Sequence, residues 1–293
     1  MKLTKKTEYD AERKIKEVYR VDKNGVKQGA FERYDDHKKI RERGYYKDGL
    51  VHGENETYRP DGSLEARCSY RQNQLHGLYE WYDENHQQRK KYTYKDGVMN
   101  GPYEIYYDNG LLAEKGCYQD GKREGGRSVY RADGALDYTC AYQQGVKEGR
   151  FILYHDNGFI CCEQMYRAGI KDGIHKKYYK DGTLRCQYIY ENGKFNGICK
   201  VYHSNGLLWE ECAYQNGKKN GKCIEYDVRG NPILKCSYKN GELDGFYERR
   251  HKIGNFKEMY LYCEGKKICG QGKQAYKKMM QRIKYEQSRQ KGD

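Results

Sequence analysis

The stretch from Tyr94 to Tyr118 reads Y-K-D-G-V-M-N-G-P-Y-E-I-Y-Y-D-N-G-L-L-A-E-K-G-C-Y, and its pattern recurs along most of the 293-residue chain. Its first tyrosine returns every 24 positions, and a second tyrosine lies half a period later, with Arg250 as the only exception. The two series together hold 19 of the 33 tyrosines. A fixed period of this length is the signature of a repeat architecture. The first series is Tyr46, Tyr70, Tyr94, Tyr118, Tyr142, Tyr166, Tyr190, Tyr214, Tyr238 and Tyr262.

Three glycine positions recur with the same period and hold 28 of the 34 glycines. Two of them usually follow Asp or Asn, as in Asp96-Gly97 and Asn109-Gly110. Such dipeptides supply the positive φ angles that tight hairpin turns require. Asn73 replaces glycine in one repeat, and asparagine tolerates the same angles. We therefore interpret the periodic glycines as turn residues, with Gly101, Gly110, Gly197 and Gly206 as representatives.

The segments between the turns have the length and the alternation of β-strands. Residues 112, 114, 116 and 118 alternate with polar positions, and a side-chain period of two indicates a strand with one buried face. In the other half of the repeat the switch to Tyr106 breaks the alternation, which predicts a β-bulge. One repeat is thus one hairpin. The sequence predicts an all-β fold: an elongated, single-layer antiparallel sheet of about ten tandem 24-residue hairpins.

The pattern Y-x-x-G-x-x-x-G-x-x-x-x-Y-x-x-x-G-x-L resembles the MORN repeat, in the variant found in the bacterial YwqK-type antitoxin family. The resemblance covers roughly 80 to 85% of the chain. It implies a scaffold that neutralises a toxin, holds proteins together, binds lipid head groups or flanks a catalytic domain. No functional residue of the family is defined well enough to be carried over by position.

Three regions follow from the period. Residues 1–21 are highly charged and out of phase, and we expect them to cap the array, with residues 11–19 forming a helical turn or an irregular strand. Residues 22–269 are the array, in which the repeat at 70–93 is expected to hold the most irregular hairpin turn. Residues 270–293 are predicted to form a short basic amphipathic helix that caps the last hairpin of the array; the alternative is a helix that binds a membrane surface or a partner. Its apolar positions, at helical spacing, are Tyr276, Met279, Met280 and Ile283.

The net charge of +14 favours anionic partners, namely nucleic acid, an anionic membrane surface or an acidic protein. Lysine-rich surfaces also serve solubility alone. We find no apolar segment of signal-peptide or membrane-spanning length, so we expect an intracellular, cytoplasmic protein.

The cysteine and histidine positions predict no metal site. Most of the twelve cysteines occupy inward strand positions, and there is no C-x-x-C pair, which favours buried thiols. Equivalent cysteines of adjacent repeats would lie about 9.6 Å apart, beyond disulfide reach. In an oxidising compartment the expected pairs would be Cys161 with Cys162, or Cys263 with Cys269. His155, His203 and His251 lie 48 residues apart, so we interpret them as solvated turn residues.

No nucleotide-binding, metalloprotease or nucleophile-elbow motif occurs, so we expect no catalysis and no cofactor. The surface carries the functional hypothesis instead. Aromatic residues off the main apolar stripe either form a core on the second face or anchor a partner. Trp209 is the sharpest candidate, because other repeats place charged residues at its position. A broken basic stripe is expected on the same outer face; its members are Arg67, Arg89, Lys91, Lys115, Arg185, Lys235 and Lys257.

We therefore predict a non-catalytic protein-binding scaffold, of which toxin neutralisation is the version implied by the resemblance. The alternatives are electrostatic binding to anionic lipids or nucleic acid, and an architectural component, for example of a virus particle. Exposed end strands could also pair with a second copy of the chain. The residues predicted to contact a partner are Trp209, Trp81, Tyr79, Tyr103, Arg185, Lys115 and Lys235.

Overall fold

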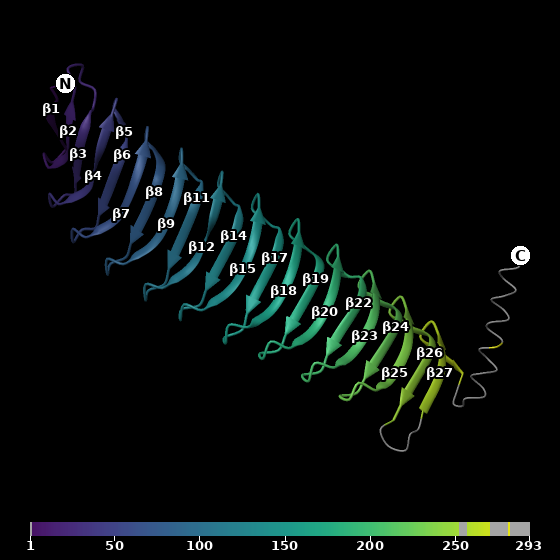
Figure 1. The fold of residues 1–293 in the computed structure, drawn as a ribbon. Coiled ribbons are helices and arrows are strands. Elements are labelled where there is room, and N and C mark those ends of the chain that lie inside the picture. Colours follow the sequence, from purple (N-terminus) through teal and green to yellow (C-terminus); the bar gives the residue numbers. More distant parts are fainter. Residues whose placement is uncertain (1, 252–256, 270–280, 282–293) are drawn as a thin grey trace, which may run out of the picture. The chain divides into compact units, whose positions relative to one another are not determined.

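The computed structural model describes residues 2–251, 257–269 and 281, and every secondary-structure element in this part of the chain is a β-strand (Figure 1). The chain divides into two compact units, Met1–Lys147 and Glu148–Asp293. The predicted C-terminal helix lies, apart from Gln281, outside the described residues. The predicted all-β fold of antiparallel hairpins is confirmed. Within the described residues there is no helix with the length and hydropathy needed to cross a membrane.

The first unit contains sixteen strands, each paired antiparallel with its neighbours. Its first two strands form a hairpin, so the segment 1–21 adopts the strand alternative and not the helical one. The strands are β1 (Thr4–Tyr9), β2 (Ile15–Val21), β3 (Gly29–Tyr34), β4 (Ile40–Lys47), β5 (Leu50–Val51), β6 (Gly53–Tyr58), β7 (Leu64–Arg71), β8 (Gln74–Tyr82), β9 (Gln88–Lys95), β10 (Val98–Met99), β11 (Gly101–Tyr106), β12 (Leu112–Gln119), β13 (Lys122–Arg123), β14 (Gly125–Tyr130), β15 (Leu136–Gln143) and β16 (Val146–Lys147).

The second unit repeats the same arrangement. Its strands are β17 (Gly149–Tyr154), β18 (Ile160–Arg167), β19 (Ile170–Tyr178), β20 (Leu184–Glu191), β21 (Lys194–Phe195), β22 (Gly197–Tyr202), β23 (Leu208–Gln215), β24 (Lys218–Tyr226), β25 (Pro232–Lys239), β26 (Glu242–Arg250), β27 (Lys257–Cys263) and β28 (Lys266–Cys269).

Two kinds of turn alternate along the chain. Asp96 and Gly97 form a two-residue turn in which both φ angles are positive, 49° and 83°, as a type I′ turn requires. The other turn is a three-residue loop that ends at Gly110, whose φ is 79°. The two-residue turns of successive repeats are also joined, because the Gly97 N–H donates to Leu75 O and the Gly121 N–H to Met99 O.

Gly101 and Gly197 are not turn residues, contrary to our expectation. Both begin a strand just after a turn, and both have a positive φ, 123° and 94°. Gly110 and Gly206 do lie in turns, as predicted, with φ of 79° and 82°. In the repeats where the strand continues through the equivalent glycine, Gly77 and Gly221, the register shifts beside that glycine, at the junction between repeats.

The predicted bulge is confirmed. In each regular hairpin the register shifts by one residue next to the half-period tyrosine, as between Ile105 and Tyr106. Tyr106 lies two residues after Glu104 on the same face of β11, and its hydroxyl donates to Glu104 at 2.6 Å. The extra residue of that bulge is Ala113, and Arg185 and Trp209 are the extra residues in their own repeats.

The repeat at 70–93 is not irregular, so that expectation was wrong. Its hairpin keeps the same loop hydrogen bonds as its neighbours: Asp83 N donates to Gln87 O at 2.9 Å and His86 N to Asp83 O at 3.1 Å. His86 and Asn73 adopt the positive φ angles of the glycines that they replace, 61° and 65°. The backbone geometry is therefore maintained without glycine at these two positions.

In each unit one row of side chains runs through the centre of one face, which we call the inner face; it carries Phe31 and Tyr103 in the first unit and His175 and Cys212 in the second. Directly paired residues of neighbouring strands form this central row, and many are buried. In the first unit the row includes Phe31, Gly44, Asn55, Cys68, Tyr79, Tyr92, Tyr103, Gly116, Arg127 and Cys140. In the second it includes Phe151, Gln164, His175, Tyr188, Cys199, Cys212, Cys223, Cys236, Tyr247 and Tyr260.

The periodic tyrosines cover the central row from one side. Ring centroids of Phe31 and Tyr46 lie 4.5 Å apart, and those of Tyr103 and Tyr118 lie 5.0 Å apart. Such tilted aromatic pairs add stabilisation beyond the area that they bury. This arrangement explains the invariance of the 24-residue tyrosine series within this chain: each ring covers a central-row residue that lies fifteen positions earlier.

In several repeats the residue that opens the three-residue loop bonds to the following repeat. The Tyr107 hydroxyl donates to Tyr130 O at 2.6 Å, and His155 Nε2 and His203 Nε2 each lie 3.2 Å from a backbone carbonyl of the next repeat. His155 and His203 are half-buried, so they are connectors between repeats and not solvated turn residues. His251 is exposed and lies 3.1 Å from Glu258.

His175 makes the stability of the second unit depend on pH. Its side chain is 5% exposed, and burial, with Lys171 and Lys177 nearby, lowers its pKa to about 4. Because the unfolded chain takes up a proton near pH 6.5 and the folded chain does not, stability must fall as pH drops from about 6.5 to 4. We expect His175→Phe to remove about 2–3 kcal/mol of this loss. Urea unfolding of both proteins at pH 7 and pH 4 measures this loss of stability, and an equal loss in the wild type and the variant would contradict the prediction.

Candidate interaction surface

A row of exposed apolar side chains lies on the outer face of the second unit, opposite the central row. We call it the outer apolar row; it consists of Met165, Ile174, Ile189, Ile198 and Ala213, from strands β18, β19, β20, β22 and β23. Met165, Ile174 and Ile198 are 39%, 48% and 42% exposed. At a strand spacing of about 4.8 Å the row extends over roughly 20 Å. Contiguous exposed apolar surface of this kind marks interaction sites.

Glycines pack against the outer apolar row and keep it compact. A Cβ atom on Gly173 would lie 3.2 Å from Met165 Cβ, and one on Gly221 would lie 3.0 Å from Ala213 Cβ. A side chain at these positions would therefore push the row apart. The glycine series to which Gly173 and Gly221 belong, which lies at or near the start of a strand, thus has two roles: it adopts the positive φ, and it leaves space for the outer side chain of the preceding strand.

A polar row borders the outer apolar row on the same face. Lys176 Nζ lies 3.9 Å from Glu163 Oε1, and Lys200 Nζ lies 3.6 Å from Glu211 Oε2. These pairs are partly exposed and contribute little to stability. An apolar centre with a polar border is the usual composition of a protein–protein interface. The border residues are Glu163, Lys176, Gln187, Lys200 and Glu211.

The predicted basic stripe is not a free basic surface. In the first unit acidic and basic residues alternate strand by strand along one outer row. Arg67 lies 3.0 Å from Glu56, and Lys115 lies directly across from Glu104. Neighbouring acids therefore offset the basic charge there. The row is Glu32, Arg43, Glu56, Arg67, Glu80, Lys91, Glu104 and Lys115.

The other predicted basic residues lie elsewhere. Lys235 lies between Ile224 and Glu248 on the outer face. Arg89 lies 3.7 Å from Asp83, and Lys257 lies 2.8 Å from Glu248. Our prediction of a basic stripe did not take into account the acidic partners of these residues, such as Asp83 and Glu248.

Three of the predicted aromatic anchors lie on the inner face of the first unit. Tyr103 is 2% exposed in the central row and Tyr79 is half-buried there, so both have the core role that we left open for them. Trp81 is half-buried on the inner face, with Arg59 and Lys90 at 5.9 and 5.4 Å from its ring. Phe151 also lies in the central row.

Trp209 and Arg185 occupy equivalent bulge positions in adjacent repeats. Trp209 is 46% exposed and packs on His203 with a ring separation of 5.9 Å. The Arg185 guanidinium lies 5.7 Å from the Tyr179 ring, in the same relation to its loop. The structure thus brings these two predicted residues into one row of the second unit.

Replacement of Trp209 by alanine should leave stability nearly unchanged. The exposed ring contacts one loop residue, and substitutions at such sites usually change stability by within about 0.5 kcal/mol. Chemical unfolding followed by circular dichroism measures the change. A loss of several kcal/mol would show that Trp209 belongs to the core.

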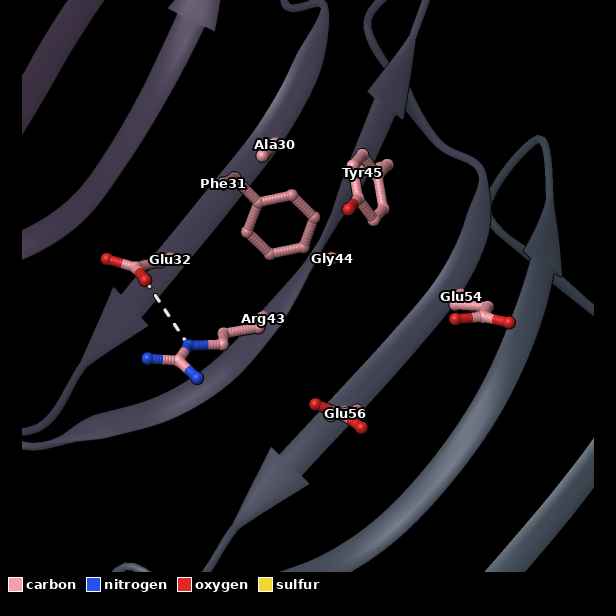
Figure 2. Close-up of a pocket in the computed structure, with 8 residues that line it drawn as sticks. All are labelled: Ala30, Phe31, Glu32, Arg43, Gly44, Tyr45, Glu54 and Glu56. Carbon is pink, nitrogen blue, oxygen red and sulfur yellow. Dashed lines mark hydrogen bonds and ion pairs between the residues drawn. The ribbon is translucent and has the colours of Figure 1, made fainter.

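A shallow pocket on the first unit is too small and too charged for an assigned ligand (Figure 2). It is lined by Ala30, Phe31, Glu32, Arg43, Gly44, Tyr45, Glu54 and Glu56, with a volume of about 220 Å³. Ligand pockets usually reach about 300–1,000 Å³. Glu32 and Arg43 pair with each other at 3.2 Å across its floor, so neither charge is available as a dedicated ligand contact.

Over its whole length the chain is only weakly similar to the solved structures that it matches. No curated protein matches the chain. Among solved structures, TcdB2-TccC3 is similar, at 12% identity and a TM-score of 0.19, over 90% of this chain and 16% of that one. A porin-like protein from Bacteroides uniformis is similar at 10% identity and a TM-score of 0.17, over 88% of this chain and 92% of that one. The chain therefore spans about one sixth of the first of these proteins. Superposition at this level indicates neither a common fold nor a common function.

The family model of the MORN repeat variant matches three segments, residues 99–120, 171–194 and 195–216. The last two of these contain most of the outer apolar row. The chain thus carries MORN-type repeats, which are typical of scaffolds that take part in interactions.

Proposed function

We propose that the chain is a non-catalytic scaffold that binds another protein through the outer apolar row. The exposure of Met165, Ile174 and Ile198 on adjoining strands of one face is the observation that supports this proposal. Burial of such side chains by a partner is favourable by about 25 cal/mol per Å² of apolar surface. The flat, polar-bordered row resembles the centre of an interface more than it resembles a pocket for a small molecule.

The resemblance to the bacterial antitoxin family adds a finer hypothesis: that the partner is a toxin, which the scaffold neutralises by covering it. Electrostatic binding to anionic lipid or nucleic acid is less favoured, because the outer basic residues of the first unit alternate with acids. An architectural role would use the same apolar row with a different partner.

An affinity pull-down from the source organism, washed first at about 0.15 M and then at about 0.5 M salt, tests the class of partner. Apolar contacts withstand the higher salt concentration, whereas phosphate contacts weaken as counterions compete. We expect one protein to be retained in stoichiometric amount through both washes. Recovery of nucleic acid or lipid alone, lost in the second wash, would overturn the proposal in favour of electrostatic binding.

A further inference from the structure

Four buried cysteines lie side by side across four successive strands of the second unit. Cys199 faces Cys212, Cys212 faces Cys223, and Cys223 faces Cys236 across neighbouring strands. Each is at most 4% exposed within the central row. In the first unit, by contrast, Cys68 faces Asn55 and Tyr79, and Cys140 faces Arg127. Thiols of the central row are therefore brought together at this one place among the described residues.

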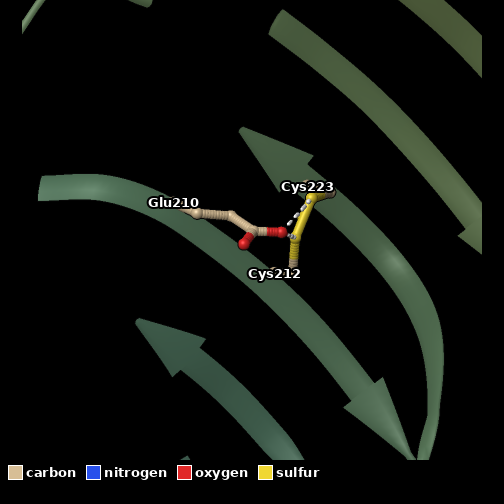
Figure 3. A group of neighbouring side chains, drawn as sticks. All are labelled: Glu210, Cys212 and Cys223. Carbon is tan, nitrogen blue, oxygen red and sulfur yellow. Dashed lines mark hydrogen bonds between the residues drawn. A yellow bond between two sulfur atoms is a disulfide. The ribbon is translucent and has the colours of Figure 1, made fainter. Parts of the chain in front are cut away.

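The middle pair shares a carboxylate. Cys212 and Cys223 form a cross-strand disulfide, and Glu210 points its carboxylate at both sulfur atoms (Figure 3). Glu210 Oε1 lies 2.9 Å from Cys212 Sγ and 3.5 Å from Cys223 Sγ. The three donor atoms all lie within 4.8 Å of one another. While the disulfide is present, neither sulfur carries a hydrogen that could donate a hydrogen bond to this carboxylate. The close approach of the carboxylate to both sulfur atoms therefore suits the reduced thiol pair better.

The charge of the cluster also suits a bound cation. Lys219 Nζ lies 2.7 Å from Glu210 Oε1 and 3.8 Å from Cys223 Sγ, and it balances the carboxylate. When two thiols exchange their protons for one divalent ion, the total charge of the buried cluster does not change. Lys219 would then hold the carboxylate in position as an outer partner of the ligand set.

We propose that the reduced cluster of Glu210, Cys212 and Cys223 binds one thiophilic divalent cation of the Zn²⁺ class. Thiolates with a carboxylate select such an ion over Mg²⁺ or Ca²⁺, which require oxygen ligands. Cys199 and Cys236 each face one member of the pair, so a further thiol is available on either side. A dithiol reductant supplies two electrons and two protons, which cleave the S–S bond as the reductant forms its own disulfide. Metal binding then releases the two thiol protons.

Cadmium titration of the full chain tests the proposal. The protein is reduced with a dithiol, the reductant is removed without air, and the twelve thiols are confirmed by thiol titration in denaturant. Cd²⁺ is then added while the ultraviolet thiolate-to-metal band is followed, and Zn²⁺ is tested by competition with a chromogenic chelator. We expect one tightly bound equivalent per chain. Glu210→Gln should weaken binding by about tenfold or more.

Matched double variants locate the ion. Cys212→Ala/Cys223→Ala should lose the equivalent, whereas Cys68→Ala/Cys140→Ala removes two buried thiols of the same row and should keep it. The row holds Gly44 and Gly116 in other repeats, so small residues are compatible with the fold, and metal-free unfolding confirms this for both variants. The proposal would be overturned if the reduced wild type bound no ion, if Cys212→Ala/Cys223→Ala still bound one equivalent, or if Cys68→Ala/Cys140→Ala lost binding to the same extent.

Discussion

Replacement of Gly101 by valine is expected to destabilise the first unit by about 3 kcal/mol or more. Gly101 has a φ of +123°, which a β-branched residue strongly disfavours. A Cβ atom there would also lie 2.9 Å from Thr93 Cβ, on the neighbouring strand, so the strands would have to separate. Strain and overpacking act together at this position. Urea unfolding followed by circular dichroism measures the shift in midpoint.

Gly126→Val is the matched control for that substitution. Gly126 lies in β14, has no positive φ, and no atom lies within 4 Å of the position of its Cβ. Valine favours strands, so stability there should change by within about 0.5 kcal/mol. An unchanged midpoint for Gly101→Val would mean that the glycines at strand starts are not required. Gly197, with φ +94° and Ile189 Cδ1 at 3.3 Å, should respond as Gly101 does.

Replacement of Glu114 by leucine is expected to cost about 3 kcal/mol. Arg127 Nε and Nη2 donate to the two Glu114 oxygens at 2.7 and 2.6 Å, and the Tyr103 hydroxyl also donates to this carboxylate. Burial opposes the charged form of Glu114, but these hydrogen bonds outweigh it and lower the pKa. Leucine would leave Arg127, whose side chain is 15% exposed, without its carboxylate.

The double variant Glu114→Leu/Arg127→Phe separates the charge pair from the packing. The equivalent positions in other repeats hold Leu234 and Phe151, so both side chains fit the inner face. Because replacing both partners of a buried ion pair by apolar residues is often neutral, we expect the double variant to recover most of the lost stability. A double variant as unstable as the single one would show that the carboxylate acts through something other than Arg127.

The repeats, the hairpins, the two-residue turns and the bulge could be predicted because each depends on residues close in sequence. Asp96-Gly97 predicts its turn through the φ angles that it tolerates, and the break in alternation before Tyr106 predicts the register shift at that point, although the extra residue is on the facing strand. The misassignment of Gly101 has the same origin: a positive φ is common to turns and to bulges, so composition does not distinguish them.

The alternating charges and the paired cysteines could not be predicted by comparing equivalent positions 24 residues apart. Contacting residues on neighbouring strands, such as Glu56 and Arg67 or Cys212 and Cys223, are eleven residues apart. Their contact depends on the strand register, which the bulges shift. The expected disulfide pair Cys161–Cys162 does not form, since both are free thiols; Cys263 is free as well.

The outer apolar row was missed for a different reason. Equivalent positions elsewhere hold polar residues such as Ser69, Thr93, Arg150 and Lys222 as well as apolar ones such as Tyr45, Leu78 and Phe246, so comparison of the repeats does not single out residues 165–213. A local run of Met165, Ile174, Ile189 and Ile198 at spacings of nine and fifteen residues was the available signal. This signal can be recognised only when the strand register, which places these residues on one face, is known.

The affinity of the captured partner for the purified chain tests the scaffold account most directly. Lysine at positions 174 and 198 should not disturb the fold, because Arg150 and Lys222 already occupy the equivalent outer positions in other repeats. If the row is the interface centre, calorimetry should show binding to Ile174→Lys/Ile198→Lys weakened by about 100-fold or more. Leu78→Lys, an equally exposed position of the first unit, should bind within about threefold of wild type. Equal affinities of the double variant and the wild type would contradict the account.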